Sequence, residues 1–162
     1  MSLADRLQAD MKDAMRDGDA LKRDTLRMVL SAAHNAQVAA RRPLTDDELV
    51  GVLSKEAKTR RESIEAFSAV GRTDLADKER AEAGIIAAYL PAALTEDEIR
   101  AMVAEAISTT GASSARDLGK VMGALSPRIR GRADGKQVSG LVAQELAKLD
   151  LVAHAHGGGG GS

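Results

Sequence analysis

The sequence predicts an all-α protein, and three observations support this fold class. Ala, Leu, Val and Met supply most of the apolar content (44%), whereas the 162 residues include only one Phe, one Tyr and no Trp. Charged residues make up 29% of the chain, and unbranched apolar residues combined with Glu, Lys and Arg favour helix over sheet. No segment alternates apolar β-branched residues with polar ones, so no strand is predicted.

Capping residues predict four helices before Pro91. Ser2 with Asp5 can cap the first helix and Gly18 can end it, because side-chain oxygens satisfy the free N–H groups at a helix start and glycine adopts the left-handed conformation at a helix end. Thr45-Asp-Asp-Glu48 has the form of a capping box. The four helices are expected to run from Ser2 to about Arg16, from Asp19 to about Arg41, from Thr45 to Gly71, and from about Thr73 to Ala88.

Three more helices are predicted after the break at Tyr89-Leu90-Pro91. The first starts at Thr95-Glu-Asp-Glu98, a second capping-box match, and ends at Gly111. Ser113 or Ser114 caps the next, which is expected to stop near Pro127, and a turn over residues 131–135 precedes the last. The sequence therefore predicts a four-helix N-terminal domain over residues 1–92 and a three-helix C-terminal domain over residues 93–149.

Residues 150–162 differ from the rest of the chain. They include His154-Ala-His156 and end in five glycines and a serine, which is typical of a flexible linker that cannot help to build a core. We therefore expect an added linker without a functional role. Two histidines would leave most of a metal coordination shell unfilled, so neither a metal nor another cofactor is expected.

Charge and composition limit the class of protein. The 23 basic and 24 acidic residues give a net charge of −1, which argues against a protein that coats nucleic acid through bulk positive charge, although a local basic patch remains compatible with it. The chain has no cysteine and no apolar run near the roughly 20 residues of a membrane span. We expect a soluble cytoplasmic protein with no membrane partner.

Catalytic motifs are not found. His34 is the only histidine before the tail, and no serine–acid arrangement accompanies it in the sequence. Neither a GxxxxGK[ST] loop nor a GxGxxG turn is present. No catalytic residue is therefore assigned, and we do not expect the chain to be an enzyme by itself.

The segment Leu118–Gly140 combines glycines with basic residues. From Ala112 to Gly140 there are six basic and two acidic residues, a local charge of +4 (6 − 2). Gly119 and Gly123 share one helix face, which suits either close packing of another helix or approach of a sugar-phosphate backbone. The residues before the last helix could hold a phosphate on backbone N–H groups and cations, or could simply form a turn with positive φ at glycine.

Two further features bear on nucleic-acid binding. Dense mixed charge in the third and fourth helices is expected to form a salt-bridged exposed surface; the alternative is a basic stripe, made of Lys55, Lys58 and Arg61, that contacts RNA or a protein partner. Phe67 and Tyr89 are too few to stack single-stranded bases. These features favour contact with the backbone and shape of a folded RNA.

Four segments together resemble the YqeY family, the stand-alone relatives of the tail domain of the B subunit of glutamyl-tRNA(Gln)/aspartyl-tRNA(Asn) amidotransferase. They are SLADRLQADMKDAMRDGDALKRDTLRMVLSA, KEAKTRRESIEAF, AEAGIIAAYLPAALTEDEI and TGASSARDLGKVMGALSPRIRGRADGKQVS. The resemblance implies an N-terminal helical bundle and a small C-terminal helical domain. It also implies contact with tRNA near the outer corner of the L-shaped molecule.

By this resemblance, the candidate RNA contacts are Lys120, Gly123, Arg130, Gly131, Arg132, Gly135 and Lys136. The leading hypothesis is a non-catalytic tRNA-binding accessory protein for which no DNA partner is expected. One alternative is an accessory component of carbon–nitrogen ligation with glutamine as amido donor, acting with amidotransferase or aminoacyl-tRNA synthetase components. The other is a helical protein-interaction module in which RNA has no part.

Overall fold

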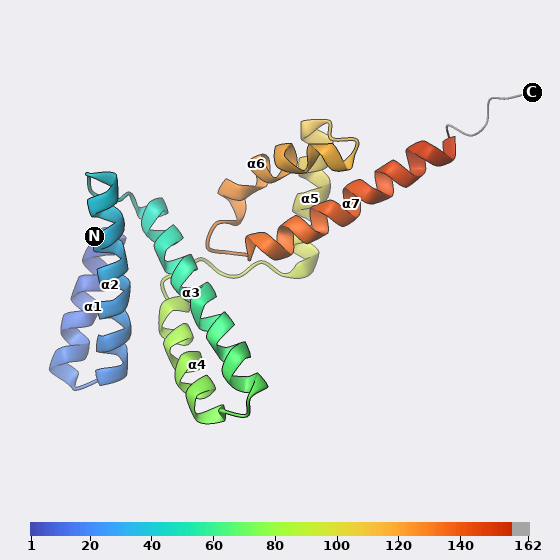
Figure 1. Ribbon diagram of the computed structural model, residues 1–162. Coiled ribbons are helices and arrows are strands. Elements are labelled where there is room, and N and C mark those ends of the chain that lie inside the picture. The colour runs from blue at the N-terminus through green and yellow to red at the C-terminus, as the bar shows by residue number, and fades with distance from the viewer. Residues whose placement is uncertain (157–162) are drawn as a thin grey trace, which may run out of the picture. The chain divides into compact units, whose positions relative to one another are not determined.

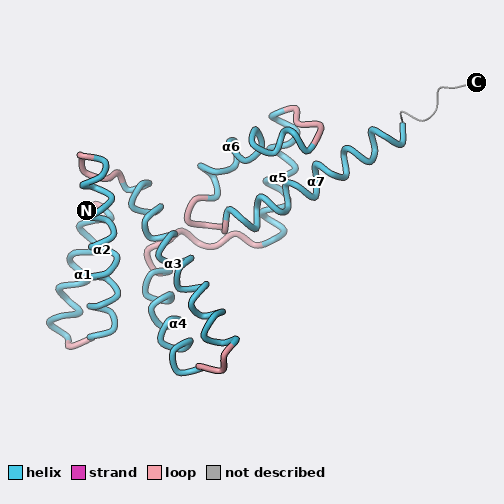
Figure 2. The backbone as a smooth tube through the Cα atoms, in the orientation of Figure 1, coloured by secondary structure: helices cyan, strands magenta, loops and turns pink. Residues whose placement is uncertain are grey.

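A computed structural model describes the backbone of residues 1–156 and the side chains of residues 1–153. The described backbone forms seven α-helices and one short 3₁₀ helix, and it contains no strand (Figures 1 and 2). The predicted all-α fold class is therefore confirmed. The glycine-rich end of the predicted linker, residues 157–162, lies outside the described residues.

The chain divides into two compact units, of which the first is Met1–Pro91 and the second begins at Ala92. The first unit contains α1 (Leu3–Asp17), α2 (Ala20–Ala40), α3 (Asp46–Ala69) and α4 (Thr73–Ala87). The second contains α5 (Glu96–Thr110), the 3₁₀ helix η1 (Ala115–Asp117), α6 (Leu118–Ile129) and α7 (Gly135–His156).

Two antiparallel helix pairs, α1 with α2 and α3 with α4, build the first unit (Figure 1). Gly18 and Gly71, at φ 72° and 73°, make the turns of the two pairs, where a left-handed backbone is required. The apolar faces of all four helices meet in one core, because each helix repeats its apolar residues every three or four positions. The buried members of this core are Leu7, Leu26, Val29, Leu49, Leu53, Ile86 and Tyr89.

The predicted caps form as local sequence dictates, with one difference. Ser2 with Asp5 and Thr45 with Glu48 each make both hydrogen bonds of a capping box. At the start of α5, the Thr95 hydroxyl oxygen accepts from the Glu98 N–H at 3.1 Å, but the Glu98 carboxylate does not accept from the Thr95 N–H. The predicted second capping box is therefore only half formed.

The second unit has its own core, to which α5, α6 and α7 each contribute a row of apolar side chains. Val121 and Leu125 of α6 meet Val138, Val142 and other residues of α7, and all four side chains are completely buried. The remaining buried members are Ile99, Val103, Ala106, Ala112, Ile129, Leu141 and Leu146. This core fixes which face of α6 is left outside.

Two helix ends lie beyond their predicted positions. Helix α6 passes through Pro127 and ends at Ile129, because Ile129 is buried in the core and its carbonyl accepts from the N–H groups of Arg132 and Ala133 at 2.9 and 3.0 Å. A proline so near the helix end forfeits few backbone hydrogen bonds. Helix α7 continues to His156, and Asp150 is held by the fold, because its carboxylate accepts from the Ala115 N–H at 3.2 Å.

Candidate nucleic-acid interface

Helix α6 has a buried face and an exposed face that includes two glycines. Val121, Leu125 and Ile129 face the core. At 100° per residue, the opposite face carries Gly119 and Gly123, both of which are exposed. The exposed side of α6 therefore has two positions without a side chain, next to exposed side chains such as Lys120 and Pro127.

No other described part of the second unit packs on these glycines. A Cβ atom placed on Gly119 or Gly123 would meet nothing within 4 Å. Of the two interpretations of the sequence, close packing of another helix of the second unit is therefore excluded. Glycine in a helix interior costs about 1 kcal/mol relative to alanine, and no intramolecular contact explains that cost here.

Lys120 lies in the first turn of α6, with its side chain exposed. Its charge acts on Asp117, whose carboxylate accepts from the N–H groups of Ser113 and Ser114 at 2.8 and 3.3 Å. These two bonds hold the pKa of the Asp117 carboxyl below its usual range, and the charge of Lys120 lowers it further. Asp117 therefore stays ionised and offsets part of the Lys120 charge.

The loop between α6 and α7 carries most of the predicted contacts. Gly131 has φ 74°, so the left-handed backbone that the turn interpretation requires is present. Arg130 and Lys136, on either side of this loop, are exposed and make no side-chain hydrogen bond or ion pair with another described residue. These two cations are the ones most available to an anionic partner.

Arg132 differs from its neighbours because it is half-buried and already engaged. Its Nε–H donates to the Ala92 carbonyl at 3.3 Å, and its own carbonyl accepts from the Leu94 N–H at 2.8 Å. The sequence showed a cation in a turn, but it could not show which carbonyl the guanidinium binds.

The start of α7 is already capped from within the chain. The Asp134 carboxylate accepts from the Lys136 N–H at 3.0 Å, and the Asp134 carbonyl accepts from the Val138 N–H. Gly135 is exposed at the first position of the helix, and its Cβ position is open. Because an internal carboxylate holds this helix N-terminus, a phosphate would depend on the cationic side chains rather than on these N–H groups.

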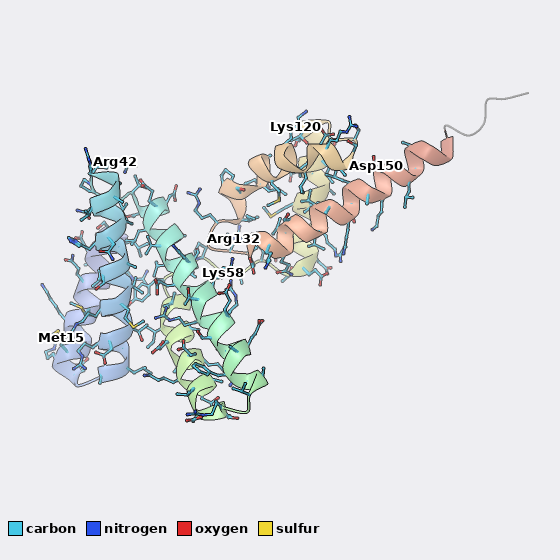
Figure 3. The ribbon with its side chains drawn as sticks, in the orientation of Figure 1. Met15, Arg42, Lys58, Lys120, Arg132 and Asp150 are labelled. Atoms are coloured by element: carbon cyan, nitrogen blue, oxygen red, sulfur yellow. The ribbon has the colours of Figure 1, made fainter. Side chains whose placement is uncertain are left out.

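The seven predicted contacts therefore fall into two groups within the second unit. Lys120 and Gly123 lie in the first half of α6, and the other five lie in or beside the α6–α7 loop. Figure 3 labels Lys120 and Arg132 toward opposite ends of α6. Twelve residues of helix span about 18 Å, so Lys120 and the loop cations lie toward different ends of α6, with both glycines near Lys120. We call this surface the α6 face; it comprises Gly119, Lys120, Gly123, Arg130 and Lys136.

The first unit contains a buried ion-pair network that was not predicted from the sequence. Arg60, expected on an exposed charged surface, is 3% exposed and pairs with Glu56 of its own helix and with Glu82 of α4. The signal was its spacing, because Arg60 follows Leu49 and Leu53 along the buried face of α3. By contrast, Lys55 and Lys58 are exposed as expected, and Figure 3 labels Lys58 on α3.

Other candidate chemistry finds little support among the described residues. His34 is exposed on α2. Within the described side chains, no three His, Cys, Asp or Glu residues gather closely enough to share a metal ion. None of the helices within residues 1–156 combines the length and apolar character of a membrane span. The side chains of His154 and His156 lie outside the described side chains.

Comparison with known proteins gives one consistent result. Residues 4–146 match the family described as Yqey-like protein. A protein of Pyrenophora tritici-repentis, named altered inheritance of mitochondria protein 41, mitochondrial, is 35% identical over 137 residues, which cover 83% of this chain and 75% of that protein. Proteins of the same name from Eremothecium gossypii and Saccharomyces cerevisiae are 39% and 36% identical over 87 and 85 residues, and the matches span about half of each chain.

The relatives correct one expectation. These proteins are named as mitochondrial, which contradicts the cytoplasmic location expected from the sequence. The expectation rested on the absence of cysteine and of a membrane span, and neither feature distinguishes one reducing compartment from another.

Proposed function

The chain belongs to the YqeY-like family, and on that basis we propose that it is a non-catalytic accessory protein that binds tRNA through the α6 face. The observation that carries the proposal is the pair of open glycines on α6 beside the exposed Lys120, with the exposed Arg130 and Lys136 beyond the end of the same helix. An uncovered helix backbone allows a bulky sugar-phosphate chain to approach closely, and the flanking cations attract its charge.

The kind of RNA follows from what the α6 face lacks. No aromatic residue lies on it, so stacking of unpaired bases is not available. Helical RNA instead presents phosphates and 2′-hydroxyl groups across a wide, shallow minor groove, which proteins recognise by shape. The α6 face therefore suits the folded, double-helical parts of tRNA rather than a single strand.

Salt dependence provides the test. Binding of tRNA to the full chain is measured between about 50 and 200 mM salt, for wild type and for the double variant Arg130→Ala/Lys136→Ala. Each phosphate contact contributes close to one unit to the slope of log affinity against log salt. We expect the double variant to bind more weakly and to lose about 1–2 units of slope.

The control removes the same charge from the other unit. Lys55→Ala/Lys58→Ala deletes two exposed cations of α3 and should leave both affinity and slope unchanged. If this control weakens binding instead, the RNA contact belongs to the α3 stripe. If no variant and no salt concentration gives tRNA binding, the proposal fails, and capture of protein partners would favour the interaction-module or amide-transfer alternatives.

A further inference from the structure

Arg60 of α3 is a buried cation whose hydrogen-bond donors are poorly satisfied. Its Nη1–H donates to the Glu56 carboxylate, but its buried Nε–H makes no hydrogen bond, although Glu82 Oε2 lies 3.4 Å from Nε. Its Nη2–H donates to the Sδ atom of Met28, on α2, at 3.7 Å. A thioether sulfur is a weak acceptor, and a buried donor on a charged group costs more free energy when poorly satisfied than a neutral one. A stronger acceptor in place of this sulfur should therefore stabilise the first unit.

The Met28 side chain is also accessible to small molecules. Met28 is 46% exposed, and together with Ala32 and Glu56 it lines an open hollow of about 560 Å³ between α2 and α3. The apolar residues that form the core of the first unit do not include Met28. An oxygen atom added to its sulfur is therefore not forced into an apolar environment.

Oxidation by a hydroperoxide supplies the stronger acceptor. A lone pair of the sulfur forms the new S–O bond, the O–O bond of the hydroperoxide breaks, and its proton passes to the leaving oxygen, so that methionine is oxidised to the sulfoxide and hydrogen peroxide is reduced to water. N–H···O hydrogen bonds measure about 2.7–3.2 Å, so an oxygen on a sulfur that lies 3.7 Å from Nη2 can come within this range. The flexible methionine side chain allows this oxygen to turn toward the guanidinium.

We infer that Met28 is a reversible oxidation site for hydroperoxides, at which the sulfoxide oxygen accepts a hydrogen bond from Arg60 and holds α2 more firmly on α3. This inference does not depend on the proposed function. The chain has no cysteine, so its six methionines carry all of its sulfur. Oxidation of methionine commonly disrupts a fold because it makes an apolar side chain polar, whereas oxidation of Met28 should stabilise this one.

Limited treatment of the full chain with hydrogen peroxide tests the site, and tryptic mass spectrometry locates each sulfoxide. The matched control is Met15 of α1 (Figure 3), which is 51% exposed and whose sulfur makes no hydrogen bond with another described residue. Each methionine is studied with the other replaced, in Met15→Leu and in Met28→Leu, at a peroxide dose that leaves the core-packed Met11 intact.

Amide exchange within residues 24–35 and 52–60 reports on the contact between α2 and α3. Oxidation of Met15→Leu, which retains Met28, should slow this exchange about tenfold, which corresponds to one hydrogen bond to a charged group. Oxidation of Met28→Leu should leave the exchange unchanged. Methionine sulfoxide reductases should restore the original rate in the first variant.

Glutamine at position 28 tests the hydrogen bond without an oxidant. Met28→Gln provides a neutral amide oxygen on a flexible side chain, and glutamine and leucine have similar helix propensities. Exchange within residues 24–35 and 52–60 should therefore be slower in Met28→Gln than in Met28→Leu. The same two substitutions at Met15 should not differ from each other.

Three results would overturn the inference. The first is oxidation of Met15 at a peroxide dose that leaves Met28 intact, because the site would then be closed to the oxidant. The second is a Met28 sulfoxide that leaves amide exchange unchanged or accelerates it. The third is equal exchange in Met28→Gln and Met28→Leu, which would show that an oxygen at this position gains no bond from Arg60.

Discussion

The hydroxyl group of Tyr89 donates a 2.6 Å hydrogen bond to Asp10 Oδ2, which ties the end of α4 to the middle of α1. The Arg6 guanidinium lies 4.8 Å from the centre of the same ring, close enough for a cation–π contact. The last buried residue of the first unit is thus fixed by two residues of the first helix.

Tyr89→Phe should lower the free energy of unfolding by about 1–2 kcal/mol, because the half-buried Asp10 carboxylate loses its hydrogen-bond donor while the ring still fills the core. Denaturant unfolding of the full chain measures the change. Asp10→Asn keeps an acceptor at the same place and should be less damaging. Equal stability of Tyr89→Phe and wild type would show that the bond contributes nothing.

We also expect Tyr89 to make the folded protein less stable at alkaline pH. Burial, and then the hydrogen bond to Asp10, raise the pKa of Tyr89 above its ordinary value of 10.0. Above that pH the unfolded chain gives up its tyrosine proton while the folded chain keeps it, so unfolding becomes more favourable as pH rises. Because this is the only tyrosine, its ultraviolet absorbance follows the titration directly, and Tyr89→Phe should abolish this part of the pH dependence.

We expect Glu48 to make the folded protein less stable at low pH. The hydrogen bond from Arg42 is the largest cause that lowers the pKa of Glu48 to about 2, with further help from Thr45. Its contribution to stability is complete above pH 4.5 and is lost as pH falls toward 2, because the unfolded state takes up the proton first. Glu48→Gln should therefore flatten the pH dependence of unfolding in this window, and an unchanged curve would exclude the Arg42–Glu48 pair as its cause.

We expect replacement of the buried Arg60 to lower the free energy of unfolding much more than replacement of its exposed neighbours. Arg60→Ala leaves Glu56 and Glu82 facing each other without their shared cation, and removal of one partner from a buried ion pair costs about 3–5 kcal/mol. Lys58→Ala, two residues away on the exposed face, should change the free energy of unfolding by less than about 0.5 kcal/mol. Similar values for the two variants would place Arg60 among ordinary surface charges.

Local chemistry explains why much of the fold can be predicted from the sequence. Ser2, Thr45 and Gly18 act within one helical turn, so their roles are visible in three or four consecutive residues. Arg60 and Pro127 were misjudged because their environment comes from elements far away in the sequence. Helix α6 continues beyond Pro127 because Ile129 is buried in the core. Arg60 can be buried because Glu82 of α4 forms an ion pair with it.

The candidate site likewise has features that the sequence could predict and features that it could not. The glycine spacing and the local excess of cations are properties of consecutive residues, so the sequence indicated where an anionic partner would bind. It could not show that Arg132 is engaged with Ala92, or that Asp134 caps α7, because both depend on how the loop folds. The structure therefore leaves Arg130 and Lys136 as the cations to mutate first.

Gly123→Ala separates a structural role of the glycine face from a binding role. Because nothing lies within 4 Å of the new methyl group, alanine should raise the free energy of unfolding by about 1 kcal/mol through helix propensity alone. If the α6 face binds RNA, the same methyl group obstructs close approach of the backbone and weakens tRNA binding. Stability and affinity should thus change in opposite directions, which no general defect of folding produces.

Gly84→Ala is the matched control for this prediction. Gly84 lies inside α4 of the first unit, is exposed, and is equally open around its Cβ position. Its replacement should give a similar gain in thermal and denaturant stability with no change in tRNA affinity. A Gly123→Ala variant that is more stable and binds tRNA as tightly as wild type would show that the open glycines of α6 do not contact RNA, and would leave the flanking cations as the whole of the site.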